Sequence, residues 1–144
     1  MPALALAAVL AASSPLIDGW RVEPVPEAPG SCKARRAGAE LNLTLLINTV
    51  GKPVLVISRP EWSNGGDKAA TTVSIDGGAP QALEMMPLGP LYLGLIDDPA
   101  LAEAFKTGKS VVWTVPQGRF RAEIAGLGQA AEDIRACEAA AKKG

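Results

Sequence analysis

Cys32 and Cys137 are the only cysteines in this sequence of 144 residues, and they lie far apart along it. Their spacing is not the CxxC of a thioredoxin-like redox pair. In an oxidising compartment, an even and distant pair is typical of a structural disulfide. The alternative is a pair of buried free thiols in a cytosolic protein. We expect the disulfide.

Carboxylates are the other groups suited to chemistry, because the sequence contains no histidine. Histidine has the ordinary pKa nearest neutrality, and it is a common zinc ligand. Its absence excludes Ser-His and Cys-His nucleophile systems. A carboxylate-based hydrolase would need a pocket that gathers two acids. The candidates are Glu61, Asp67, Asp76 and Glu84.

Trp62 stands at the entrance of a Gly-rich loop that contains Asn64 and Asp67. Backbone N–H groups of such a loop could cradle an anion, and its oxygens could bind calcium, but the spacing matches neither a P-loop nor an EF-hand. A partly exposed tryptophan could anchor a partner, whereas the alternative is a lid over the edge of the sheet. We take Trp62, Asn64 and Asp67 as candidate binding residues.

Charge and methionine spacing argue against nucleic-acid and copper partners. The chain carries 14 basic and 15 acidic residues, with no basic stripe of the kind that binds phosphates. Met85 and Met86 are neighbours on an expected strand, so their thioethers would point to opposite faces and could not hold one Cu(I) together. We expect no cofactor and no metal.

The first residues resemble an export signal. No charged side chain precedes Asp18, and Ala3 to Ala12 is a continuous apolar run. This run is shorter than the ~20 residues that span a bilayer, and its length is that of a signal-peptide core. Met1 and Pro2 supply no basic start, however, and a retained N-terminal helix is the alternative. We expect a signal peptide over residues 1–13 and one domain over 18–144.

Alternating apolar residues predict three hairpins, over residues 41–58, 71–86 and 110–124. The segment Leu91–Leu95 could add another strand, and we expect Pro87 to end the strand before it. Residues 20–30 hold several prolines, which suits a short edge strand followed by an irregular arm.

Two helices are expected. Asp98 before Pro99 is a strong helix start, and Gly108 is a stop, so the adjacent Asp97 and Asp98 are explained as helix-capping residues and not as a catalytic pair. The alanine-rich segment 129–142 forms a second helix, in which Cys137 shares an apolar stripe with Ala130 and Ile134.

The order of several short motifs resembles small secreted proteins of alphaproteobacteria that are loosely similar to the invasion-associated locus B family. The motifs are Trp20, Cys32, Pro-Glu-Trp at 60–62, Val-Ser-Ile-Asp-Gly at 73–77, Gly-Leu-Gly-Gln-Ala-Ala at 126–131, and Cys137. The resemblance implies a periplasmic location, a β-sandwich-like core and a disulfide to the last helix. It supplies no catalytic residues.

The sequence therefore predicts an α+β domain, mainly antiparallel β, built as a sandwich or curled sheet with one inserted helix and a C-terminal helix. We expect a non-catalytic periplasmic or secreted module that binds an envelope protein or a small ligand, without a membrane span in the mature chain. The alternatives are a small carboxylate-based hydrolase and a protein inhibitor of an envelope enzyme.

Overall fold

Alternation of buried and exposed side chains defines the strands, as the computed structural model shows for residues 16–17, 19–63 and 69–143. In β5 (Pro53–Ser58), for example, Leu55 and Ile57 are buried while their neighbours are more exposed. The other strands are β1 (Leu16–Ile17), β2 (Trp20–Pro24), β3 (Cys32–Arg36), β4 (Asn42–Ile47), β6 (Ala69–Ile75), β7 (Gln81–Leu88), β8 (Leu91–Leu95), β9 (Ser110–Val115) and β10 (Gly118–Glu123).

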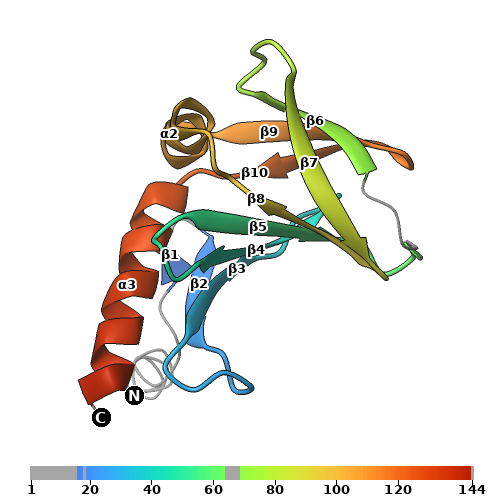
Figure 1. Ribbon diagram of the computed structural model, residues 1–144. Helices are drawn as coiled ribbons and strands as arrows, with labels where there is room; N and C mark the ends of the chain where they lie inside the picture. Colours follow the sequence, from blue (N-terminus) through green and yellow to red (C-terminus); the bar gives the residue numbers. More distant parts are fainter. Residues whose placement is uncertain (1–15, 18, 64–68, 144) are drawn as a thin grey trace, which may run out of the picture.

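These strands form a single antiparallel sheet in the order β1-β2-β3-β4-β5-β8-β7-β6-β9-β10 (Figure 1). The three predicted hairpins are confirmed as β4–β5, β6–β7 and β9–β10. The strand expected at 91–95 is β8, which pairs with both β5 and β7. The predicted α+β class, with a dominant and curled antiparallel sheet, is confirmed.

One strand was not predicted and one local expectation is wrong. Cys32–Arg36 forms the strand that was not predicted, β3, whose backbone pairs with β2 on one side and β4 on the other. Pro87 does not end β7 but lies inside it, opposite Tyr92 of β8. Its missing N–H is tolerated there because the described pairing of β7 with β6 extends only from Gln81 to Met85.

Both predicted helices are present. At the start of α2 (Pro99–Thr107), the Asp98 carboxylate accepts a hydrogen bond from the Leu101 N–H at 3.3 Å, so the capping explanation of this acid is confirmed. The helix α3 (Leu127–Lys143) buries Ala130 and Ile134. It packs against β2, β3, β4 and α2, at the end of the sheet where Figure 1 shows it beside β1 and β2.

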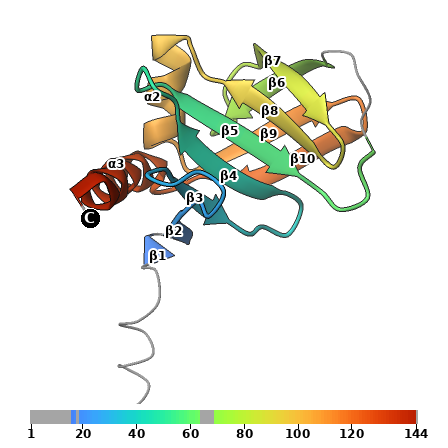
Figure 2. The same ribbon diagram turned by 60° about the horizontal axis from the view of Figure 1, so that its bottom comes forward.

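The sheet curls around one apolar core. Trp20, Trp113, Tyr92 and Phe105 are among the largest fully buried side chains, and they come from both halves of the sheet and from α2. The curl, seen from a second side in Figure 2, brings β10 back toward the segments that flank β4 and β5. Arg59, which follows β5, places its guanidinium 4.9 Å from the centre of the Phe120 ring of β10.

Candidate functional site

A hollow of about 410 Å³ opens where the curled sheet comes back on itself, and its volume is within the range typical of ligand pockets. One wall is the connection between β3 and β4, and the other is the second half of β10. The lining residues are Arg36, Ala37, Gly38, Ala39, Glu40, Leu41 and Leu43 on the first wall, and Arg121, Ala122 and Glu123 on the second. We call this hollow the seam groove.

The connection between β3 and β4 is held in a fixed shape. A Cβ atom on Gly38 would lie 2.5 Å from the carbonyl oxygen of Leu41, so only glycine permits this close approach. Arg59 donates from its guanidinium to the carbonyl oxygen of Glu40 and also pairs with the carboxylate of Glu61. The bond from Arg59 lowers the pKa of Glu61 below its ordinary value.

The opposite wall is a free strand edge. The Arg121 N–H donates to the Glu40 carboxylate at 3.0 Å, so it points away from β9. Because hydrogen-bonding directions alternate along an antiparallel ladder, the N–H and C=O groups of Arg119 and Glu123 point the same way. β10 is the last of the described strands in the sheet, so these groups face the groove or solvent instead of a neighbouring strand.

Arg36 of the groove shares a single carbonyl acceptor with Trp20. Trp20 Nε1 and Arg36 Nη1 each donate to the Ala125 oxygen at 3.0 Å. Ala125 connects β10 to α3, so the two bonds tie this connection to β2 and β3. The groove therefore lies between elements that are fixed relative to each other.

A second hollow, of about 490 Å³, lies on the other side of the same connection. It is lined by Gly19, Arg21, Arg35, Arg36, Ala37, Asn42, Leu43, Thr44 and Ser58. Arginines give this hollow a positive character, but Glu23 pairs with Arg35 at 2.6 Å and offsets part of it. The polar strand residues around it are exposed or half-buried.

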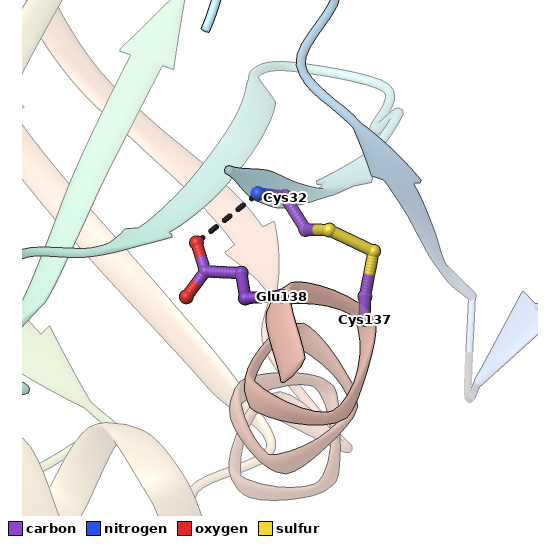
Figure 3. The surroundings of a disulfide bond; sticks show 3 residues. All are labelled: Cys32, Cys137 and Glu138. Carbon is purple, nitrogen blue, oxygen red and sulfur yellow. Dashed lines mark hydrogen bonds between the residues drawn. A yellow bond between two sulfur atoms is a disulfide. The ribbon is translucent and has the colours of Figure 1, made fainter. Parts of the chain in front are cut away.

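The structure joins Cys32 at the start of β3 to Cys137 of α3 by a disulfide, with 6.2 Å between the two Cα atoms (Figure 3). Glu138 adds a second link, because its carboxylate accepts a hydrogen bond from the Cys32 N–H at 3.1 Å. Cys137 packs against the core on the stripe of α3 that contains Ile134. Together these contacts fix α3 on the sheet.

The outer face of the middle strands is apolar. Met86, Leu88 and Leu95 are 48%, 50% and 42% exposed, although each is a large hydrophobic side chain. They share this face with half-buried residues on β4, β5 and β8, namely Leu46, Val54, Val56, Leu91 and Leu93. The expected opposition of the two methionines is confirmed, since Met85 is buried and Met86 is exposed.

Trp62 does not have the exposure that we expected of a binding residue. Its side chain is only 6% exposed, and its ring makes edge contacts with Tyr92 at 5.3 Å and Phe120 at 5.4 Å. Expecting a partly exposed ring was wrong, because the curl of the sheet brings two aromatic rings against it. These contacts match the alternative of a lid over the edge of the sheet. Asn64 and Asp67 lie outside the described residues.

The candidate acids serve separate local contacts. Glu61 pairs with Arg59, whereas Asp76 accepts hydrogen bonds from the Lys109 and Ser110 N–H groups, both at 3.0 Å. Those two bonds hold the pKa of Asp76 below its ordinary value. Glu84 is exposed on the outer face of β7, and Asp67 lies outside the described residues. Within the described ranges, no three acidic or cysteine side chains are grouped so that they could hold a metal ion.

The seam groove was not predicted from the sequence, because neither Glu40 nor the edge of β10 was among the candidate site residues. A signal was available in β10, where Arg119, Arg121 and Glu123 alternate with the inward side chains. Charged outward residues on a short strand are typical of an edge. The opposite wall had no such signal, because Glu40 reaches β10 only through the curl of the whole sheet.

The fold and the groove define the class of protein: a small, disulfide-linked, curled antiparallel sheet closed at one end by two helices. The structure of invasion associated protein B from Bartonella henselae has a similar fold, with a TM-score of 0.63. The match covers 83% of this chain and 94% of that one, at 14% sequence identity. No protein-family model and no curated protein sequence matches this chain. The comparison confirms the loose structural similarity predicted from the motifs.

None of the helices among the described residues is long and apolar enough to cross a membrane.

Proposed function

We propose that this protein is an exported, non-catalytic binding module that works in the periplasm or at the cell envelope. The observation that carries the proposal is the disulfide between Cys32 and Cys137. Such bonds form and persist in oxidising compartments, whereas cytosolic thiols are kept reduced. In this proposal residues 1–13 are a signal peptide, and residues 18–144 are the mature domain.

A binding role is supported by the shape of the surface. The seam groove combines a fixed wall, a free strand edge and charges of both signs in one hollow. The fold is shared with a protein whose name associates it with invasion, and we take a role at the cell envelope from that name as part of the proposal. Two acids, Glu40 and Glu123, line the groove, but each is engaged locally, because Glu40 accepts the Arg121 N–H and Glu123 pairs with the Arg121 guanidinium. We take these contacts to favour binding over catalysis.

The test is to treat cells that produce the native protein with a thiol-alkylating reagent before lysis, and then to sequence the N-terminus. We expect a chain that begins near residue 14, stays unlabelled, and is released with the periplasmic or secreted fraction. A chain that keeps Met1-Pro2 and carries the reagent on both cysteines would overturn the proposal. Alkylation after reduction provides the control that both thiols are reachable by the reagent.

A further inference from the structure

We infer that the seam groove binds an extended peptide segment of a partner protein, which pairs with the free edge of β10 as an added strand. The inference rests on the proposed binding function and assigns its site. Its first support is the edge itself. The backbone groups of Arg119, Arg121 and Glu123 face away from β9, and an extended backbone is the ligand whose N–H and C=O groups match their alternation.

The second support is the bond between Glu40 and Arg121. A side-chain carboxylate accepts the Arg121 N–H at the position where the carbonyl group of an adjacent strand would accept it. Glu40 therefore occupies the place of one backbone acceptor. Its side chain is exposed, and this single hydrogen bond can be exchanged for that of an arriving strand without disturbing the core.

The third support is the opposite wall. The β3–β4 connection bounds the groove, and the exposed Ala37 and Ala39 provide small, apolar surface along it. The proposed strand, with small or medium apolar side chains, lies along β10 beside this wall. The connection comes within one side-chain length of the β10 edge, because the Glu40 carboxylate reaches the Arg121 N–H. A single strand needs less room at this edge than a second sheet does, so the geometry favours a peptide over a second copy of this chain.

The charges at the groove indicate which contacts with the peptide matter most. Arg121 and Glu123 pair with each other at 3.2 Å, so the edge presents a neutralised pair and not a strong single charge. We therefore expect recognition to depend mainly on backbone hydrogen bonds and apolar side chains. The affinity for the peptide should then change little with salt concentration. Salt screens interactions between exposed charges, and the proposed binding does not depend mainly on such interactions.

The probe is a nine-residue peptide selected from a random display library on the full oxidised chain. The decisive variant is Arg121→Pro, which removes the edge-facing N–H but none of the bonds to β9. Its matched control is Arg121→Ala, which removes the side chain and keeps the N–H. We expect Arg121→Pro to weaken the selected peptide at least tenfold and Arg121→Ala to change its affinity less than threefold. Equal effects of the two substitutions, or no effect of either, would overturn the inference.

A second pair of variants tests the role of Glu40. Glu40→Ala removes the competing acceptor and should raise peptide affinity about two- to tenfold, the value of one net hydrogen bond. Glu40→Gln keeps an acceptor and should bind like the wild type. If the Glu40→Ala variant bound the peptide as tightly as the wild type or more weakly, the idea that the peptide displaces the Glu40 carboxylate would be wrong.

Amide hydrogen exchange locates the bound peptide independently of folding defects in a variant. On binding to the wild-type chain, the Arg119 and Glu123 amides should slow at least tenfold, while Phe120 and Ala122, which already pair with β9, should change little. Methylation of a peptide backbone nitrogen should abolish binding at every second residue, where the N–H points toward β10, and should have little effect at the residues between. Protection on the outer face of β8 instead, dimerisation of the chain on addition of peptide, or failure of the library to yield a binder would each overturn the inference.

These outcomes are separate from the test of export. A protein that is exported and oxidised but fails to bind peptides at β10 would retain its proposed location and lose this site. A cytosolic, reduced protein that binds peptides at β10 would show the reverse.

Discussion

Cys32 and Glu138 are joined by a hydrogen bond of 3.1 Å directly beside the disulfide, so the start of β3 is connected to α3 through two adjacent residues of the helix. The first link is covalent, and the second depends on the position that the first one fixes. These two links hold a helix whose buried side chains are Leu127, Ala130, Ala131 and Ile134.

Replacement of Cys137 by serine should lower the free energy of unfolding by about 2–5 kcal/mol, because the disulfide closes a loop with a sequence separation of 105. Urea unfolding of the oxidised wild type and the variant measures the difference. Ala136→Ser, at an exposed neighbouring position of α3, is the control and should cost less than about 1 kcal/mol, the difference in helix propensity between alanine and serine. Identical midpoints for Cys137→Ser and the wild type would contradict a stabilising role of this bond.

Ile134→Ala should cost about 2–5 kcal/mol, because the side chain is fully buried between α3 and the sheet. The effect should be present in both oxidised and reduced protein if the helix remains docked by its apolar stripe. Chemical denaturation under both conditions is the measurement, with the exposed Glu132→Ala as the control. A loss seen only in the oxidised protein would mean that the helix leaves the sheet on reduction, so that the disulfide alone holds it.

Trp62→Ala should destabilise the fold by about 3–5 kcal/mol, since the ring packs edge-on against Tyr92 and Phe120. Trp62→Phe retains an aromatic ring and should lose much less. Thermal unfolding followed by circular dichroism distinguishes this core role from a surface role. If Trp62→Ala unfolded at the wild-type temperature, the ring would not be part of the core in solution.

Asp76 should make the free energy of unfolding depend on pH in the acidic range. The N–H groups of Lys109 and Ser110 hold its pKa in the folded state below the ordinary value of 3.8. A carboxyl group with a lowered folded pKa contributes stability above its unfolded pKa, and the contribution is lost as the pH falls through the folded pKa. Asp76→Asn keeps an oxygen acceptor without the charge, so it should be less stable than the wild type near pH 6.

The difference between Asp76→Asn and the wild type should shrink as the pH is lowered below about 4, where the wild-type carboxyl becomes protonated. Urea midpoints between pH 2 and 6 give this difference, and a carboxyl ¹³C titration gives the folded pKa directly. A folded pKa at or above the ordinary value would contradict the proposed effect of the two N–H groups. Asp76 also has a positive φ of 51°, which asparagine adopts as readily as aspartate, so the substitution adds little strain.

Local patterns were sufficient for the elements that carry their own signal. Leu41, Leu43 and Leu45 alternate with polar residues, so β4 could be predicted from the sequence, and Asp98-Pro99 specified the start of α2. β3 could not be predicted in this way. Its sequence Cys-Lys-Ala-Arg-Arg has no β-branched residue, and it becomes a strand because β2 and β4 supply partners on both sides.

The sequence by itself determined the hairpins, the presence of two helices and the expectation of a disulfide, because each depends on residue types at short spacing or on a count of two cysteines. Only the tertiary structure decided the strand order, the burial of Trp62 and the meeting of Glu40 with Arg121. Those features depend on the direction in which the sheet curls, and that direction comes from the packing of the whole core, so no short segment contains it.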